Sequence, residues 1–109
     1  MNVTVYKGNA GPTYLVTGTD AAAGLAAAKL LNETPREMVA ALIECDQGTG
    51  YGIRYAFGGT LPTQGSPSTM HYLAPGSVVV IEGHATLKSL RFINETNAEN
   101  AKLWVTPYY

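Results

Sequence analysis

The sequence predicts a mainly β protein, a jelly-roll-like antiparallel β-sandwich with one short Ala-rich helix or arm near the N-terminus. The first observation is that the chain from Met38 to Tyr109 consists of short apolar runs separated roughly every 8 to 12 residues by Gly, Pro, Asn or Asp. The second is its length, because 109 residues are close to the commonest size of a single domain. The third is that no internal repeat indicates a solenoid or a propeller. Residues 1–109 are therefore predicted to form one domain.

The N-terminal third differs from the rest in composition. Val3 and Val5 alternate with polar residues and predict a short strand, and residues 13–17 predict a second one. Residues 21–31 are rich in Ala and Leu, which favour a helix, although an internal glycine weakens it. A helix of such small residues forms only when it is docked, so an extended arm is the alternative. We expect residues 1–35 to form a strand or arm followed by this helical segment.

Strand-length runs follow Pro35, and together with the two N-terminal strands they make about eight. Pro75 and Gly76 suit the central positions of a type II turn that links two antiparallel strands. The apolar period slips between Lys88 and Arg91, which predicts a bulge or a strand at a sheet edge. Short strands in this number fit two packed sheets, and we prefer a jelly roll to an immunoglobulin-like sandwich. The predicted runs are residues 36–45, 52–57, 69–73, 78–83, 87–93 and 101–106.

The alternation of side chains within two of these runs predicts which residues face the core. In the run that begins at Ile53, we expect Ile53, Tyr55 and Phe57 to point inward and Arg54 to point outward. Trp104 lies on the opposite side of its strand from its apolar neighbours. It therefore either covers the second sheet or projects outward.

The charge of the chain excludes several classes of partner. Seven basic and eight acidic residues give a net charge of -1, so no long-range field attracts nucleic acid or an anionic membrane. Charged residues make up only 14% of the chain, whereas an average soluble domain has about 25%. A surface with so little charge indicates that partners cover part of it. We therefore expect assembly into an oligomer or a larger complex.

The residues that could support catalysis or bind a metal form no recognisable motif. Cys45, the only cysteine, ends an apolar run and is predicted to be a core residue without a disulfide partner. His71 and His84, with Glu82 near the second, could ligate a metal as cupin-type jelly rolls do, but a third histidine is missing. No nucleophile, base and orienting group have a spacing that requires them to meet. We expect neither an enzyme nor a cofactor or metal.

Aromatic residues are the most informative candidates for binding. Trp104, Tyr108 and Tyr109 are predicted interface residues, because aromatic rings bring large contact area at a low entropy cost. Tyr55 and Tyr72 lie inside strands and are expected to take part in ordinary packing. The N-terminal strand and the Ala-rich segment add further interface candidates, namely Val3, Val5 and Leu25.

Several short stretches in the second part of the chain carry a family resemblance. They are Ile53-Arg54-Tyr55 leading to Gly59-Thr60-Leu61-Pro62-Thr63, then Leu73-Ala74-Pro75-Gly76, Ile81-Glu82-Gly83, Leu90-Arg91-Phe92-Ile93 and the closing Leu103-Trp104-Val105-Thr106-Pro107-Tyr108-Tyr109. On these stretches the chain resembles the small accessory proteins of tailed bacteriophage virions, over about residues 38 to 109. The Ala-rich segment is not part of the resemblance.

The resemblance implies a capsid decoration or cement protein that binds the outer surface of the phage head and bridges neighbouring major capsid subunits. The expected partners are the major capsid protein and a second copy of the chain, with a dimer favoured over a trimer because two-fold interfaces are the commonest. With no signal peptide and no apolar stretch of membrane length, the protein would be made in the host cytoplasm and located in the virion. The alternatives are a carbohydrate-binding module that recognises a host-surface glycan, on a phage head or tail fibre, and a neck or tail adaptor.

Overall fold

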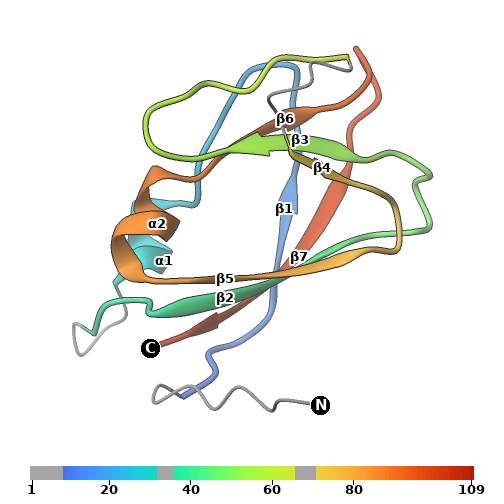
Figure 1. Cartoon of the computed structure of the whole chain (residues 1–109). Helices are drawn as coiled ribbons and strands as arrows, with labels where there is room; N and C mark the ends of the chain where they lie inside the picture. The colour runs from blue at the N-terminus through green and yellow to red at the C-terminus, as the bar shows by residue number, and fades with distance from the viewer. Residues whose placement is uncertain (1–8, 32–35, 66–70) are drawn as a thin grey trace, which may run out of the picture.

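The structure, a computed structural model, describes residues 9–31, 36–65 and 71–109, which form two antiparallel sheets packed face to face (Figure 1). This arrangement confirms a mainly β sandwich. Sheet A has the strand order β1-β7-β2-β5, and sheet B has the order β4-β3-β6. The strands of sheet A are β1 (Tyr14–Thr17), β2 (Ala40–Cys45), β5 (Val78–Glu82) and β7 (Lys102–Tyr108), and those of sheet B are β3 (Ile53–Ala56), β4 (His71–Leu73) and β6 (Arg91–Asn94).

Strand β7 lies in the interior of sheet A and alternates between the two faces of that sheet. Leu103 and Val105 are buried, while Lys102 and Trp104 are exposed, because successive side chains of a strand point to opposite faces. The predicted alternation is therefore confirmed. Of the two placements considered for Trp104, the structure has the outward one, with 40% of the residue exposed.

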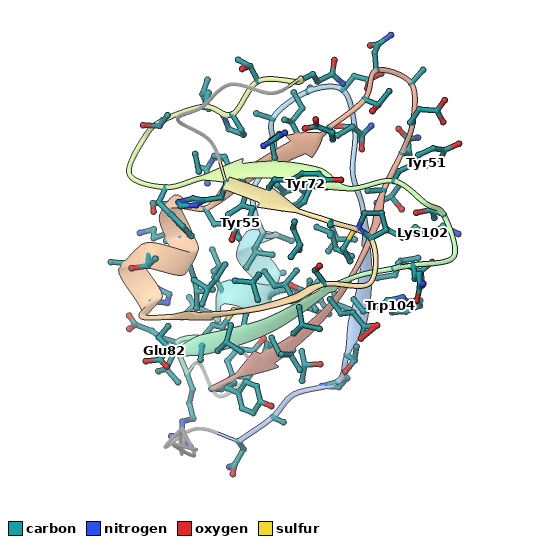
Figure 2. The ribbon with its side chains drawn as sticks, turned by 45° about the vertical axis from the view of Figure 1, so that its right-hand side comes forward. Tyr51, Tyr55, Tyr72, Glu82, Lys102 and Trp104 are labelled. Atoms are coloured by element: carbon teal, nitrogen blue, oxygen red, sulfur yellow. The ribbon has the colours of Figure 1, made fainter. Side chains whose placement is uncertain are left out.

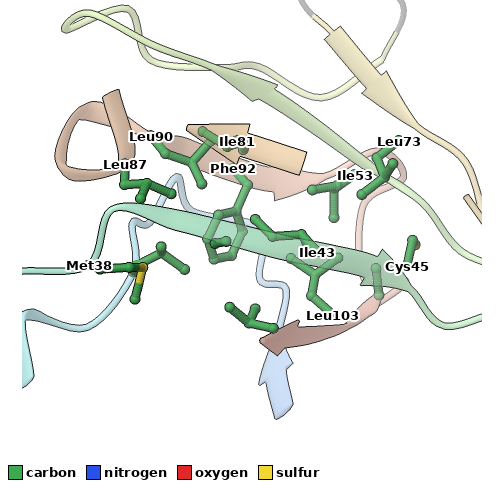
Figure 3. Packing of buried hydrophobic residues seen from close by; sticks show 14 residues of the cluster. Met38, Ile43, Cys45, Ile53, Leu73, Ile81, Leu87, Leu90, Phe92 and Leu103 are labelled. Carbon is green, nitrogen blue, oxygen red and sulfur yellow. The ribbon is translucent and has the colours of Figure 1, made fainter. Parts of the chain in front are cut away.

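The core lies between the two sheets and is apolar (Figure 3). Cys45 is fully buried in it, as predicted, and so is Ile53, whereas Tyr55 and Phe57 are half-buried at its margin. The space left between the sheets is a cavity of about 10 Å³ with apolar walls, which is at the lower limit for one water molecule. This cavity is too small for a ligand. The largest fully buried apolar side chains of the core are Met38, Leu87, Leu90, Leu103, Val105 and Cys45.

The two alternatives for the Ala-rich segment, a helix and an extended arm, each describe part of it, since α1 covers only Ala27–Leu30 and the helix is absent from the residues before it. The segment before it is extended, because the backbone N–H and C=O of Ala23 both bond to Phe92 of β6, at 2.9 and 2.8 Å. Gly24 fits tightly there, since a Cβ atom would lie 2.9 Å from the carbonyl oxygen of Leu90. Leu25, a predicted interface residue, is instead a core residue with 8% exposure, because the extended chain turns its side chain between the sheets.

The predicted strand over residues 87–93 is also wrong in its first half. Residues His84–Ser89 form helix α2, and the strand β6 begins only at Arg91. Leu87 and Leu90 are both buried and stand three positions apart, which is a helical spacing. The slip in the apolar period is therefore a change from helix to strand and not a bulge. Helices α1 and α2 lie together at one end of the sandwich (Figure 1).

The turn at Pro75 and Gly76 is confirmed, since Gly76 has φ of 80° and Ser77 N–H donates to Ala74 at 3.0 Å. The strands that it joins, β4 and β5, belong to opposite sheets and do not pair with each other. The strand predicted around Val3 and Val5 lies outside the described residues.

Candidate interaction surface

The outer face of sheet A is the side of that sheet that points away from sheet B. The strand register sets its side chains in rows, because paired residues on neighbouring strands point to the same face. The first row runs across all four strands as Leu15, Trp104, Glu44 and Val78. The second row runs from Thr106 through Leu42 to Val80. We use "outer face of sheet A" for these seven residues.

The outer face of sheet A is unusually apolar for an exposed sheet surface. Leu15, Val78, Val80 and Trp104 have exposed fractions of 43, 52, 44 and 40%. Single exposed apolar residues are normal on a protein surface, but these four stand in adjacent rows around the half-buried Leu42. Contiguous exposed apolar surface of this kind marks a site for contact with other molecules.

Polar and charged groups lie at the margins of this face. Lys102 is exposed next to Trp104 on β7, and the Nε1 atom of Trp104 lies 3.5 Å from Oδ1 of Asp46. Glu82 is exposed at the other end of the sheet, and Figure 2 shows it far from Lys102 and Trp104. The centre of the face carries one charge, that of Glu44. The face thus carries exposed apolar side chains on β1, β5 and β7, one charge near its centre and polar groups at its ends.

The C-terminal tyrosines are held against the fold. The backbone N–H and C=O of Tyr109 pair with those of Asn9 at 3.0 and 2.9 Å, and its hydroxyl donates to the carbonyl oxygen of Lys29. Burial raises the pKa of Tyr109. Tyr108 is half-buried at the end of β7. Val3 and Val5, the other N-terminal interface candidates, are outside the described residues.

The outer face of sheet B has a different character, because its polar groups satisfy one another. Arg54 forms an ion pair with Glu95, and its guanidinium lies 4.5 Å from the ring centre of Tyr72. Both effects hold Arg54 in its charged form, and the hydrogen bond that Arg54 donates to the Glu95 carboxylate is the main cause of the raised pKa of Arg54. The prediction that Arg54 points outward fits this position. A charged, paired surface is a weaker candidate for apolar contact than the outer face of sheet A.

The residues considered for catalysis or metal binding are each held in separate local contacts. His71 stacks on Tyr55, with ring centres 5.1 Å apart. His84 begins α2, and its Nδ1 atom lies 3.1 Å from the carbonyl oxygen of Met38. Burial raises the pKa of the Cys45 thiol to about 11, so the nucleophilic thiolate is disfavoured. Within residues 9–31, 36–65 and 71–109, no group of three or more His, Cys, Asp or Glu residues could hold a metal ion.

No protein-family model matches the chain, and searches of curated proteins and of solved structures give no match. In the part of the chain that the structure describes, no helix has the length and apolar character needed to cross a membrane.

Reasoning from the sequence found Trp104 but missed the aliphatic part of this surface. Val78 and Val80 stand in an entirely apolar run, so alternation gave no sign of which residues were exposed. Leu15 and Leu42 lie in strands whose neighbours are far away in the sequence. The rows appear only once the register of the four strands is known.

Proposed function

We propose that this protein is a non-catalytic structural protein that binds an assembled protein surface through the outer face of sheet A. The observation that carries the proposal is that four exposed apolar residues, Leu15, Val78, Val80 and Trp104, lie in two adjacent rows on one face of the sheet, with Glu44 as the charge between them. The cavity between the two sheets is too small for a ligand, and the low charge of the chain fits a surface that is covered in use. Fully burying an exposed side chain of this kind is worth about 1.5–3 kcal/mol, and because these four are already about half covered, a partner adds about half of that for each.

The assembled surface that we propose is the head of a tailed bacteriophage, on the basis of the family resemblance in residues 38–109. The chain would act as a capsid decoration protein on the virion, in contact with the major capsid protein. A domain that binds only the expanded shell stabilises it by mass action against rupture. A neck or tail adaptor is the related alternative, since it would also use an apolar protein contact.

We also propose that the sandwich is a jelly roll in which one strand is reduced to a short bridge. A jelly roll has eight strands and two Greek keys. Suppose that the segment around Ala23, which pairs with Phe92, counts as the second strand, and that the eight strands are then numbered along the chain. The order of strands across sheet A is then 1-8-3-6, and across sheet B it is 5-4-7-2. This is the strand order of a jelly roll. The bonds that keep residues 21–26 extended would thus have a place in the overall topology.

The test is co-sedimentation of the purified protein with expanded phage heads that lack it, alongside unexpanded procapsids. We expect saturable binding to the expanded heads. Leu15→Lys places a charge in the outer face of sheet A and should weaken binding by at least about tenfold, equivalent to about 1.4 kcal/mol. Leu61→Lys is the matched control, because Leu61 is 63% exposed but lies in a loop outside this face. Its binding should equal that of the unmodified protein.

No binding to either particle would overturn the capsid proposal. Binding to isolated necks or tails instead would favour the adaptor. Equal loss of binding for Leu15→Lys and Leu61→Lys would refute the role of the outer face of sheet A. Circular dichroism and the midpoint of urea unfolding show whether each variant is folded.

Carbohydrate binding is a second candidate, and the surroundings of Trp104 favour it. Its ring is exposed, Asp46 can accept a hydrogen bond beside it, and Lys102 can donate one. Sugar rings stack on such aromatic surfaces. Because Trp104 is the only tryptophan, intrinsic fluorescence reports directly on its surroundings. Titration with host-surface glycans should leave the fluorescence unchanged if the apolar face binds protein, and should change it saturably if the site binds sugar.

A further inference from the structure

Strand β5, with five residues, is the longest sheet edge in the described part of the chain that has no partner strand among the described residues; the other such edges, β1 and β4, have four and three residues. It pairs with β2 on one side, and none of the described residues pairs with its other side. The edge of β6 is covered by Ala23, and Pro12, which has no N–H, stands two residues before β1. Natural proteins protect an exposed edge with Lys, Pro, a bulge or a covering element. Residues Val78–Glu82 contain neither Lys nor Pro, and their pairing with β2 has no bulge.

The hydrogen-bond pattern shows which residues of β5 face this open side. At the two ends of the strand, Gly83 N–H donates to Val39 at 2.7 Å, and Ser77 accepts from the N–H of Cys45 at 2.9 Å. The odd-numbered residues of β5 therefore bond to β2. Because the direction of the backbone groups alternates along an antiparallel strand, Val78, Val80 and Glu82 point their N–H and C=O groups outward. Among the described residues, none bonds to the outward N–H or C=O of these three.

We infer that a second copy of this chain pairs with this edge, β5 against β5, as an antiparallel two-fold dimer centred on Val80. The outward groups are symmetric about Val80, so Val80 faces Val80 of the other copy, and each Val78 faces a Glu82. About six backbone hydrogen bonds join the copies, which extends the two four-stranded sheets into one sheet of eight strands. The inference concerns the purified protein alone and does not depend on what the outer face of sheet A binds.

A second copy fits this edge better than an unrelated strand because the edge is self-complementary in shape and charge. In this register the two Glu82 side chains are offset by four residues, about 14 Å along the strands, which exceeds the Debye length of about 8 Å at physiological salt. The two Val80 side chains lie side by side on the outer face, with Val78 on either side. The apolar rows of the two copies then join across the dimer axis, in an isologous contact.

Sedimentation equilibrium of the purified protein over about 1 to 500 µM tests for the dimer. We expect a reversible transition from monomer to dimer within this range. Val78→Pro removes one outward N–H in each copy at the first residue of a strand, a position where proline is tolerated. It should weaken dimerisation by at least about tenfold, whereas Val78→Thr, which keeps the N–H, should leave the dimer within about threefold. A monomer at every concentration would overturn the inference.

Disulfide cross-linking tests the register. A directly opposed, hydrogen-bonded pair has Cα atoms about 5.5 Å apart, which suits a disulfide, so Val80→Cys should form a covalent dimer on mild oxidation. Val78→Cys is the matched control, because the two copies of residue 78 would lie about 14 Å apart. Cys45 is fully buried and does not compete. Equal cross-linking of the two variants, or none with Val80→Cys, would refute pairing about Val80.

Discussion

Replacing Asn94 with Asp tests how strongly one buried amide holds three segments together. Asn94 is fully buried, and its amide group donates to Oδ1 of Asn100 at 2.8 Å and to Oδ1 of Asp20 at 3.2 Å. Its own Oδ1 accepts from the N–H of Ala101 at 3.2 Å. The bond from Asn94 is the main cause of the lowered pKa of Asp20. Asp has nearly the same shape as Asn, so Asn94→Asp changes the chemistry and hardly the packing.

The ionised carboxylate that Asn94→Asp introduces cannot donate the two hydrogen bonds that the Asn94 amide gives to Asn100 and Asp20. Its oxygen atoms would instead face the acceptor oxygens of those two residues. A buried charge that loses its partner costs about 3–5 kcal/mol, and the remaining bond from Ala101 places the cost at the lower end. We therefore expect a loss of about 3 kcal/mol in the free energy of unfolding at pH 7. That is a large part of the roughly 5–15 kcal/mol by which a domain of this size is stable.

The loss should depend on pH in a defined direction. Burial and the neighbouring Asp20 carboxylate raise the pKa of the introduced carboxyl in the folded state above its unfolded value of about 3.9. The folded variant therefore takes up a proton before the unfolded chain does, and the new O–H can donate to Asn100 or Asp20. The loss in the free energy of unfolding caused by Asn94→Asp should therefore become smaller as the pH falls from 7 to 4.5. Asp20, whose pKa is lowered, stays ionised over this range.

Urea unfolding at pH 7 and pH 4.5 measures both effects. Asn97→Asp is the matched control, because it makes the same chemical change at an exposed position. It should change stability by less than about 0.5 kcal/mol at either pH. If Asn94→Asp costs less than about 1 kcal/mol at pH 7, or costs the same at both pH values, the reasoning about the buried amide is refuted.

Three further predictions concern the interior. Phe92→Ala, at a position with 2% exposure, should lower the free energy of unfolding by about 4 kcal/mol in urea; a loss below about 1 kcal/mol would contradict a core role. Burial, with a smaller contribution from Tyr109, raises the pKa of Tyr14 to about 12, so stability should fall as the pH rises from 10 to 12, and Tyr14→Phe should make this fall smaller. Cys45 should react with a thiol reagent far more slowly in the folded protein than in denaturant, and equal rates would place it at the surface.

The sequence predicts the parts of this fold that depend on local alternation. The side of its strand on which Trp104 lies, the burial of Ile53 and Cys45, and the turn at Gly76 all follow from residue spacing or from backbone preference, whereas the choice between the two placements of Trp104 needed the structure. The buried, mainly β character of the chain after Met38 follows in the same way. These features depend on neighbours that are close in the sequence.

The features that the sequence did not predict depend on long-range contacts. Alanine favours a helix intrinsically, but the bonds of Ala23 with Phe92, far along the chain, keep that segment extended. The sequence does contain a local sign of α2, because Leu87 and Leu90 stand three positions apart, as on one face of a helix. In a run of strand length, the same spacing also fits a strand whose alternation slips. The outer face of sheet A combines Leu15, Trp104, Glu44 and Val78 from four strands. No single run contains enough of this row for the sequence alone to indicate it.

The interior position of β7 has a consequence for how the protein folds. Tyr14 pairs with Val105, 91 positions further along the chain, and β7 also separates β1 from β2. Until residues 102–108 have left the ribosome, β1 and β2 have no common neighbour, and both expose unpaired edges. Proteins dominated by such non-local pairings fold in milliseconds to seconds. During that interval β7 of one molecule can occupy the gap in another, so domain-swapped dimers should form when the chain is refolded at high concentration.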